Sequence, residues 1–180
     1  MLQKENIKLR APEPEDLEFL YKWENDTDIW QVSNTLAPYS KHILRQHIED
    51  SGKSIYETFQ QRFMIEVLDL HLPVGTIDIF DFDPLNQRAG IGILIASEEN
   101  RRKGYARLAL ECLIEYCFSR LKLHQLHCNI SKDNKASISL FTGMGFSQSG
   151  IKKDWMRSES GFTDELFFQL INPAPMIDLK

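Results

Sequence analysis

Three apolar, β-rich segments follow one another with no helix between them, and this order restricts the fold more than any other feature. The segments are RFMIEVL at 62–68, VGTIDIFDF at 74–82 and AGIGILIA at 89–96. Their many β-branched residues predict strands. The short DLHLP segment at 69–73 joins the first two as a hairpin or meander. Because strands joined by short connections run antiparallel, we expect an antiparallel sheet at the centre of the fold.

Helices alternate with strands on either side of these segments. We expect strands at 7–10, 123–130, 147–157 and 162–171, and helices from Pro14, at 40–50 with Ser40 as N-cap, from Gly104 to Leu121, and at 133–146. A turn containing Gly161 joins the last two strands. The whole pattern predicts a mixed α/β (α+β) fold with a mostly antiparallel central sheet flanked by helices.

Composition limits the function classes. At 180 residues, with 42% hydrophobic and 26% charged residues, the chain predicts one globular domain over 1–180, with a C-terminal tail after about residue 171. The net charge of −5 argues against a nucleic-acid partner. No apolar run approaches the roughly 20 residues of a membrane span, and the N-terminus lacks a signal-peptide core, so we expect a cytoplasmic protein without a membrane partner. The three cysteines form no CxxC pair and predict buried thiols, and no metal site is expected.

The segment RRKGYA at 101–106 stands between a predicted strand and a predicted helix. The first amides of a helix have no internal partner, and the helix dipole favours an anion there. Gly104 lets the backbone approach a bulky anion, small Ala106 keeps the first turn open, and Arg101, Arg102 and Lys103 add positive charge. The segment matches neither a Walker loop nor a dinucleotide fingerprint. It indicates a different kind of phosphate site, or else a solvated basic turn.

A second segment, NKASISLFTGMGF at 134–146, follows one strand later. Together the two segments resemble the GNAT superfamily of N-acetyltransferases, whose pyrophosphate motif is [Q/R]-x-x-G-x-[G/A]. Arg101, Gly104 and Ala106 fill its defined positions, and Asn134, Gly145 and Phe146 match the downstream helix of the family. Over nearly its whole length the chain is most similar to bacterial spermidine N-acetyltransferases and related enzymes that modify protein N-termini.

The resemblance implies a GNAT fold and acetyl-coenzyme A as the acetyl donor. It also implies a set of donor-binding residues, in which strand amides hold the pantetheine arm and the helix start holds the pyrophosphate. These residues are Ile93, Leu94, Ile95, Ala96, Arg101, Arg102, Lys103, Gly104, Tyr105, Ala106, Asn134, Ser137 and Phe141.

The sequence departs from the family at one catalytic position. The usual proton donor is a tyrosine seven residues after the helix-opening Asn, and here that residue is Phe141. Either another group, such as Tyr105 or water, protonates the departing thiolate, or the thiolate leaves unassisted. If position 141 faces the thioester sulfur, Phe141→Tyr is expected to speed turnover.

The candidate residues for the acceptor amine are carboxylates on the second predicted strand. Asp78 and Asp81 match acidic positions of the spermidine enzymes, and each is a candidate for amine binding or for proton removal. They lie three residues apart, so only a bend in the strand would bring both to one pocket. Glu66 is a weaker third candidate, and Tyr39, Trp30 and Trp23 are pocket or core aromatics.

Other family features are absent. The regulatory polyamine-site glutamates align with Leu36, Ala37 and Ser40, and Gly90 replaces an acidic residue common at the head of its strand. The expected activity is therefore N-acetylation of an amine, with a polyamine or diamine as one acceptor and a protein N-terminus as the rival. A coenzyme-A-binding module with weak catalysis is the alternative from another class. A homo-oligomer also remains open.

Overall fold

The computed structural model describes residues 2–33, 35–158 and 161–173. Its strands are β1 (Gln3–Lys4), β2 (Ile7–Arg10), β3 (Gln61–Val67), β4 (Leu72–Asp83), β5 (Arg88–Ile95), β6 (Gln125–Ser131), β7 (Ser147–Ser158) and β8 (Gly161–Ile171). Its helices are α1 (Leu17–Glu24), α2 (Thr27–Ser33), α3 (Lys41–Asp50), α4 (Ile55–Thr58), α5 (Tyr105–Ser119) and α6 (Lys135–Gly143), with short 3-10 turns η1 (Pro14–Asp16) and η2 (Glu98–Asn100). The tail expected after residue 171 lies mostly outside the described residues.

Within the described residues the strands form one eight-stranded sheet in the order β1-β2-β3-β4-β5-β6-β8-β7. All neighbouring pairs are antiparallel except β5 and β6, which run parallel across the α5 connection. This arrangement confirms the mixed, mostly antiparallel fold expected from the sequence. The connections explain this pattern. Short turns join β3, β4 and β5 as antiparallel neighbours, whereas the crossover through α5 allows β5 and β6 to run parallel.

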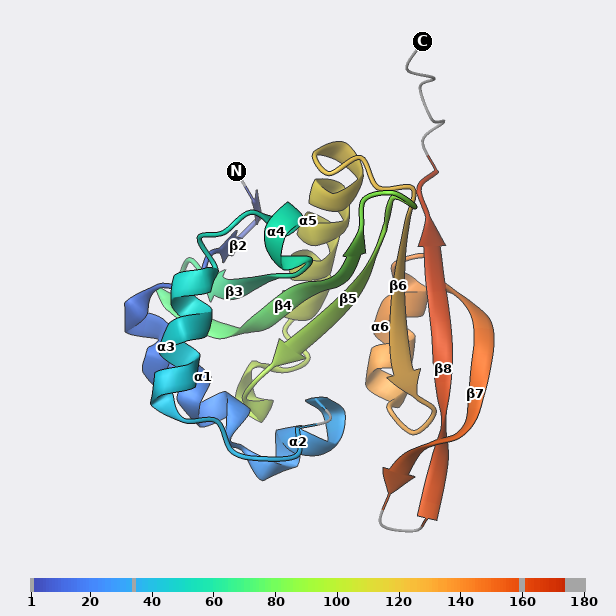
Figure 1. Cartoon of the computed structure of the whole chain (residues 1–180), viewed down its shortest axis with the longest axis horizontal. Coiled ribbons are helices and arrows are strands. Elements are labelled where there is room, and N and C mark those ends of the chain that lie inside the picture. Colours follow the sequence, from blue (N-terminus) through green and yellow to red (C-terminus); the bar gives the residue numbers. More distant parts are fainter. Residues whose placement is uncertain (1, 34, 159–160, 174–180) are drawn as a thin grey trace.

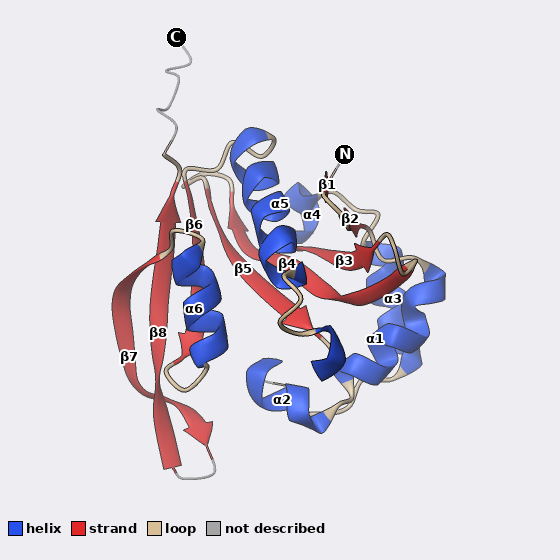
Figure 2. Ribbon diagram, turned by 180° about the vertical axis from the view of Figure 1, so that it is seen from behind, coloured by secondary structure: helices blue, strands red, loops and turns tan. Residues whose placement is uncertain are grey.

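The helices cover the two faces of the sheet separately. Helices α5 and α6 pack on one face, as the view from behind shows (Figure 2), and α1 and α3 cover the opposite face of the β2–β4 region (Figure 1). The strands alternate their side chains accordingly: in β3, Phe63 and Ile65 join the core under α5, and Met64 joins the core under α1 and α3.

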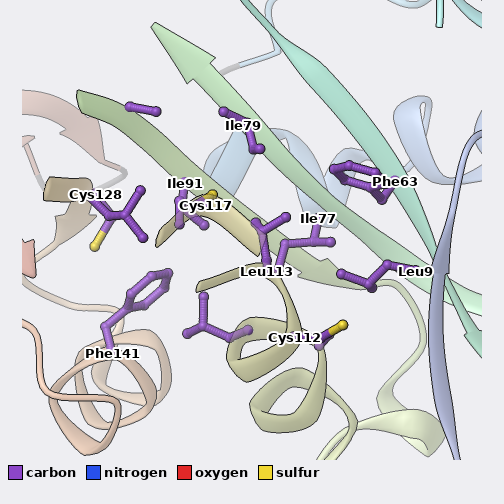
Figure 3. Close-up of a cluster of buried hydrophobic side chains, with 14 of the residues drawn as sticks. Leu9, Phe63, Ile77, Ile79, Ile91, Cys112, Leu113, Cys117, Cys128 and Phe141 are labelled. Atoms are coloured by element: carbon purple, nitrogen blue, oxygen red, sulfur yellow. The ribbon is translucent and has the colours of Figure 1, made fainter. Parts of the chain in front are cut away.

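The larger core lies between the sheet and the pair α5 and α6 (Figure 3). All three cysteines are buried in it as free thiols, as expected. Leu110, Leu113 and Cys117 form the buried stripe of α5 that the helical spacing predicts. This core joins the two halves of the sheet across the β5–β6 junction, where only three residue pairs connect the strands.

The segments expected as strands and helices are confirmed, with boundaries shifted by a few residues. Ser40 caps α3, accepting a hydrogen bond from the Ile43 amide at 3.2 Å. Three short elements, β1, α2 and α4, were not expected from the sequence. No helix in the described ranges is both long enough and apolar enough to cross a membrane.

Candidate active site

The centre of the candidate site is a fork between two neighbouring strands. β5 and β6 pair only at Arg88–Gln125, Ala89–Leu126 and Gly90–His127. Beyond Gly90 they diverge, while β5 stays paired to β4 as far as Ile95 (Figure 1). In the described part of the chain, the backbone of residues 91–95 that faces the fork therefore has no strand partner. Such an edge can accept hydrogen bonds from, and donate them to, an extended amide-containing chain.

The start of α5 lies beyond the open end of β5. Its N-cap, Gly104, has a left-handed backbone (φ 84°) and provides no side-chain cap, and the first turn of the helix carries no acidic residue. A Cβ built on Gly104 would meet no atom within 4 Å, so the space beside it is open. Arg102 and Lys103 are exposed next to it. Free amides, a dipole and two cations together suit an anion such as a pyrophosphate.

Arg101 has a different position from the other two cations. Its guanidinium donates to the carbonyl oxygens of Ile95 at 3.2 Å and Ala96 at 3.4 Å, which are the last residues before the loop. The side chain therefore holds the loop against the end of β5. Tyr105 is half-buried and packs against the main core, and Ala106 is half-buried beside it.

The second cofactor segment begins α6, on the same face of the sheet as α5 (Figure 2). Asn134 is the N-cap, and its Oδ1 accepts a hydrogen bond from the Ser137 amide at 3.0 Å. Asn134 and Ser137 are both half-buried. The two helix starts expected to hold the donor thus flank the fork from one face.

Phe141, which replaces the usual tyrosine, is buried. Its ring is only 3% exposed and packs edge-to-face on Phe146, with ring centroids 5.1 Å apart. Figure 3 shows it directed into the core, towards Cys128 and Ile91. In this structure the apolar ring belongs to the larger core, and its contact with a cofactor stays a prediction.

A cavity of about 410 Å³ opens on the opposite face of the sheet, between α1, α3 and the strands β3 and β4. Its size lies in the range of small-molecule sites. Its charged and aromatic lining residues are Glu24, Tyr39, His47, Asp50, Lys53, Arg62, Asp78 and Phe80. Of the expected acceptor residues, Asp78 and Tyr39 line this cavity and Asp81 does not.

Asp78 is held in an ion-pair cluster. Arg62 donates to both of its carboxylate oxygens, Nε to Oδ1 at 2.8 Å and Nη2 to Oδ2 at 3.1 Å, and Arg62 Nη1 also pairs with Glu24. The two carboxylates raise the pKa of Arg62 despite its burial. Asp50 and Lys53, which pair at 2.7 Å, also line the cavity. The lining therefore carries three carboxylates (Glu24, Asp50 and Asp78) and two cations (Lys53 and Arg62). The cavity is therefore weakly acidic rather than strongly so.

The other candidates lie elsewhere. Asp81 sits at an irregularity between Phe80 and Asp83, with φ 48°, and is exposed. The strand does bend there, but this bend does not bring Asp81 into the cavity with Asp78. Glu66 pairs with Arg10, which also binds Asp16 at 2.6 and 2.8 Å, so its role is in holding β2, β3 and η1 together.

The three candidate aromatics divide between cavity and core. Tyr39 lines the cavity, and its backbone is held by the Asn25 side chain at 2.8 and 3.1 Å. Trp23 belongs to the core under α1 and α3. The indole N–H of Trp30 donates to the Glu24 carbonyl oxygen at 2.8 Å.

Three cavity residues, Glu24, Arg62 and Phe80, were not among the candidates expected from the sequence. Glu24 and Arg62 are 38 residues apart, and only the packing of α1 over β3 brings them together. The one available signal was the alternation of β4, which puts Phe80 on the same face as Asp78.

Comparison with known proteins agrees with this architecture. A family model described as "Acetyltransferase (GNAT) domain" matches residues 6–147. The chain belongs to this acetyltransferase family. An uncharacterized N-acetyltransferase, p20, of Bacillus licheniformis is 26% identical over 170 residues, or 94% of this chain and 95% of the relative. The spermidine N(1)-acetyltransferase of Vibrio cholerae is 26% identical over 144 residues, or 80% of each chain.

The fold is similar to that of solved structures of the Vibrio cholerae enzyme. A crystal structure of the Vibrio cholerae spermidine N-acetyltransferase with coenzyme A and spermine superposes with a TM-score of 0.82 at 21% identity, covering 92% of this chain and 95% of the other. A second structure of that enzyme, described as dodecameric, superposes with a TM-score of 0.75. This chain is an N-acetyltransferase of the GNAT family, with that family's fold.

Proposed function

We propose that the chain transfers the acetyl group of acetyl-coenzyme A to a primary amine of a small diamine or polyamine. The observation that carries the proposal is the fork between β5 and β6, which lies between an uncapped helix start and a weakly acidic cavity. A donor bound along the fork would present its thioester to an acceptor arriving from the cavity side.

The donor half of the proposal uses the two helix starts and the open edge of β5. The pyrophosphate would lie on the amides of 102–106, and the pantetheine arm would pair with the backbone of Ile93, Leu94 and Ile95. Ala96, Asn134 and Ser137 flank that path. The left-handed Gly104 and the open space beside it support this placement.

The acceptor half uses the cavity over β3 and β4. One excess negative charge suits a ligand that brings one ammonium into the cavity and leaves another amine outside it for acetylation. Asp78 would share its charge between Arg62 and the ligand, and Tyr39 would form part of the wall.

The chemistry sets two requirements. A primary ammonium has a pKa near 10, so it must lose a proton before it can attack the thioester carbonyl. The thiolate that leaves must then be protonated. Because Phe141 has no acidic hydrogen, the second proton has to come from water, from the attacking nitrogen or from another residue.

Protein N-termini are the rival class of acceptor. We also propose that the chain forms a homo-oligomer, because a structure of the Vibrio cholerae enzyme is dodecameric. We propose that no metal takes part, and that the chain works in the cytoplasm.

The test is a thiol-release screen with acetyl-coenzyme A, comparing spermine, spermidine, short diamines, aminoglycosides and short peptides. We expect the diamines and polyamines to give the highest kcat/KM. Asp78→Asn should lower kcat/KM for these amines about tenfold, equal to about 1.4 kcal/mol, without changing acetyl-coenzyme A affinity in calorimetry. Asp81→Asn, outside the cavity, should leave the KM for the amine unchanged at neutral pH.

Two results would contradict the proposal. Peptides as the best acceptors would favour N-terminal acetylation. Binding of acetyl-coenzyme A with no turnover on any amine or peptide would indicate a coenzyme-A-binding module.

A further inference from the structure

His127 lies at the point where the fork branches. It forms the last pair between β5 and β6, opposite Gly90. Gly90 in turn pairs with Phe80 on β4, and His127 pairs with Gln169 on β8. Residues directly opposite each other across a sheet point to the same face. Phe80, Gly90 and His127 therefore form one row across the sheet, on the face that carries the cavity.

The absence of a side chain at Gly90 makes this row continuous. A Cβ on Gly90 would come within 2.3 Å of the Phe80 ring, so the ring crosses β5 through the space that Gly90 leaves. There it meets the imidazole of His127 edge-to-face, with centroids 6.0 Å apart. Phe80 also lines the cavity. One ring thus separates the cavity from His127.

The imidazole of His127 packs between two aromatic rings, and one of its nitrogens is buried without a hydrogen bond in the described ranges. Phe167 packs against its other side, with centroids 5.5 Å apart. Nδ1 is buried and finds no hydrogen-bond partner in the described ranges, although His127 as a whole is only half-buried. An unpaired buried nitrogen costs free energy. Because Nδ1 is sealed off, any proton exchange with a ligand must run through Nε2.

Burial, more than the charges around the ring, keeps the imidazole neutral. Burial lowers the pKa of His127 below its ordinary value, Asp81 on β4 opposes this, and Arg88 on β5 and Lys152 on β7 lower it further. A neutral imidazole at physiological pH is able to accept a proton. Asp81 itself is exposed at the bend of β4, so its influence is purely electrostatic.

We propose that His127 is the general base of the acetyl transfer, a role that rests on the proposed function. The acceptor extends from the cavity past Phe80 to the fork, and its ammonium gives a proton to Nε2. The freed lone pair attacks the thioester carbonyl carbon. When the C–S bond breaks, the thiolate leaves with the electron pair and takes up the second proton shed by the nitrogen, and His127 returns its own proton to solvent.

The first test is the pair His127→Gln and His42→Gln. His42 is an exposed histidine of α3, outside the cavity lining, and serves as the matched control. We expect His127→Gln to lower kcat/KM for the best amine about 100-fold or more, with unchanged acetyl-coenzyme A affinity, and His42→Gln to behave as wild type. A change of less than twofold in His127→Gln would overturn the base role.

The second test compares the pH dependence of kcat/KM with the NMR titration of the His127 ring. The wild-type pH profile of kcat/KM should fall on the acid side, at the pKa that NMR titration of the His127 ring gives in the protein without ligands. Asp81→Asn removes a carboxylate that raises this pKa, so both the NMR value and the acid limb should move to lower pH. Arg88→Gln removes a cation and should move both to higher pH. A limb that does not follow the NMR value in these variants would overturn the proposal, and this test holds even if His127→Gln fails to fold.

The outcomes distinguish the base role of His127 from the proposed function. An active wild type whose pH profile is the same in His127→Gln removes the base role alone and leaves the proposed function intact. A wild type that binds acetyl-coenzyme A but acetylates neither amine nor peptide removes the proposed function, and the base role with it.

Discussion

Gly90 and Gly92 lie on the same face of β5, but they differ in the space that a side chain would find there. A Cβ on Gly90 would lie 2.3 Å from the Phe80 ring, whereas one on Gly92 would lie 3.6 Å from it, an ordinary contact. We expect Gly90→Ala to lower the free energy of unfolding by about 1–3 kcal/mol, because the ring must move. Gly92→Ala should change it by less than about 1 kcal/mol.

Urea denaturation measures both variants, and their activities add a second comparison. Gly90→Ala should also lose turnover, since the displaced ring changes the path between the cavity and His127. Equal stabilities would show that Phe80 does not depend on the space at Gly90.

Phe141 is the residue at which the structure changes the expectation most. A tyrosine there would place a hydroxyl in the core between α6 and β6. Burying a hydroxyl without a partner costs about 1–3 kcal/mol, so Phe141→Tyr should be less stable and no faster. Phe162→Tyr is the control, because Phe162 is 66% exposed and should change stability by less than about 0.5 kcal/mol. A faster and equally stable Phe141→Tyr enzyme would show that this position reaches the thioester after all.

At the scale of elements, the start of α5 depends on its left-handed N-cap, Gly104. Valine at position 104 would be strained at φ 84° and would crowd the anion, whereas asparagine tolerates this backbone. We expect Gly104→Val to raise the acetyl-coenzyme A dissociation constant at least tenfold in calorimetry, equal to about 1.4 kcal/mol. Gly104→Asn should have an intermediate effect, because it keeps the backbone and adds only side-chain bulk. Unchanged affinity in both variants would exclude this helix start as the pyrophosphate site.

The fork itself is an element-scale feature that hydrogen exchange can test. Backbone amides of residues 91–95 that face the fork have no strand partner in the described structure, so they should exchange fast without ligand. Acetyl-coenzyme A should slow these amides selectively. The β3–β4 ladder, already paired, provides the internal control. Protection that rises equally in both regions would indicate global stabilisation rather than binding along the fork.

For the whole molecule, the core can be tested through its thiols. Cys112, Cys117 and Cys128 are at most 6% exposed, and burial raises the pKa of Cys117 and of Cys128 to about 12 and also raises that of Cys112. Since the thiolate is the reactive form, the native protein should react with a disulfide reagent far more slowly than the urea-unfolded chain, which should release three equivalents. A native thiol that reacts as fast as an unfolded one would show that the core between the sheet and α5 opens readily.

The sequence by itself determined the local elements, including the two helix starts that we propose hold the donor. Periodicity at 62–96 and in the α5 stripe is a local signal, and so are Gly104 and Asn134, because a helix start is built from consecutive residues. For these features neighbours in the chain are also neighbours in space.

Only the tertiary structure decided what lines the cavity proposed for the acceptor. Asp78 alternates with Phe80 in the sequence, but the pairing of β3 with β4 brings Arg62 to Asp78, and the packing of α1 adds Glu24. The burial of Phe141 and the meeting of Phe80 with His127 follow from strand order and register in the same way. A shift of one residue in register would turn every one of these strand side chains to the other face. That register is set by contacts between segments far apart in the chain, which no local pattern contains.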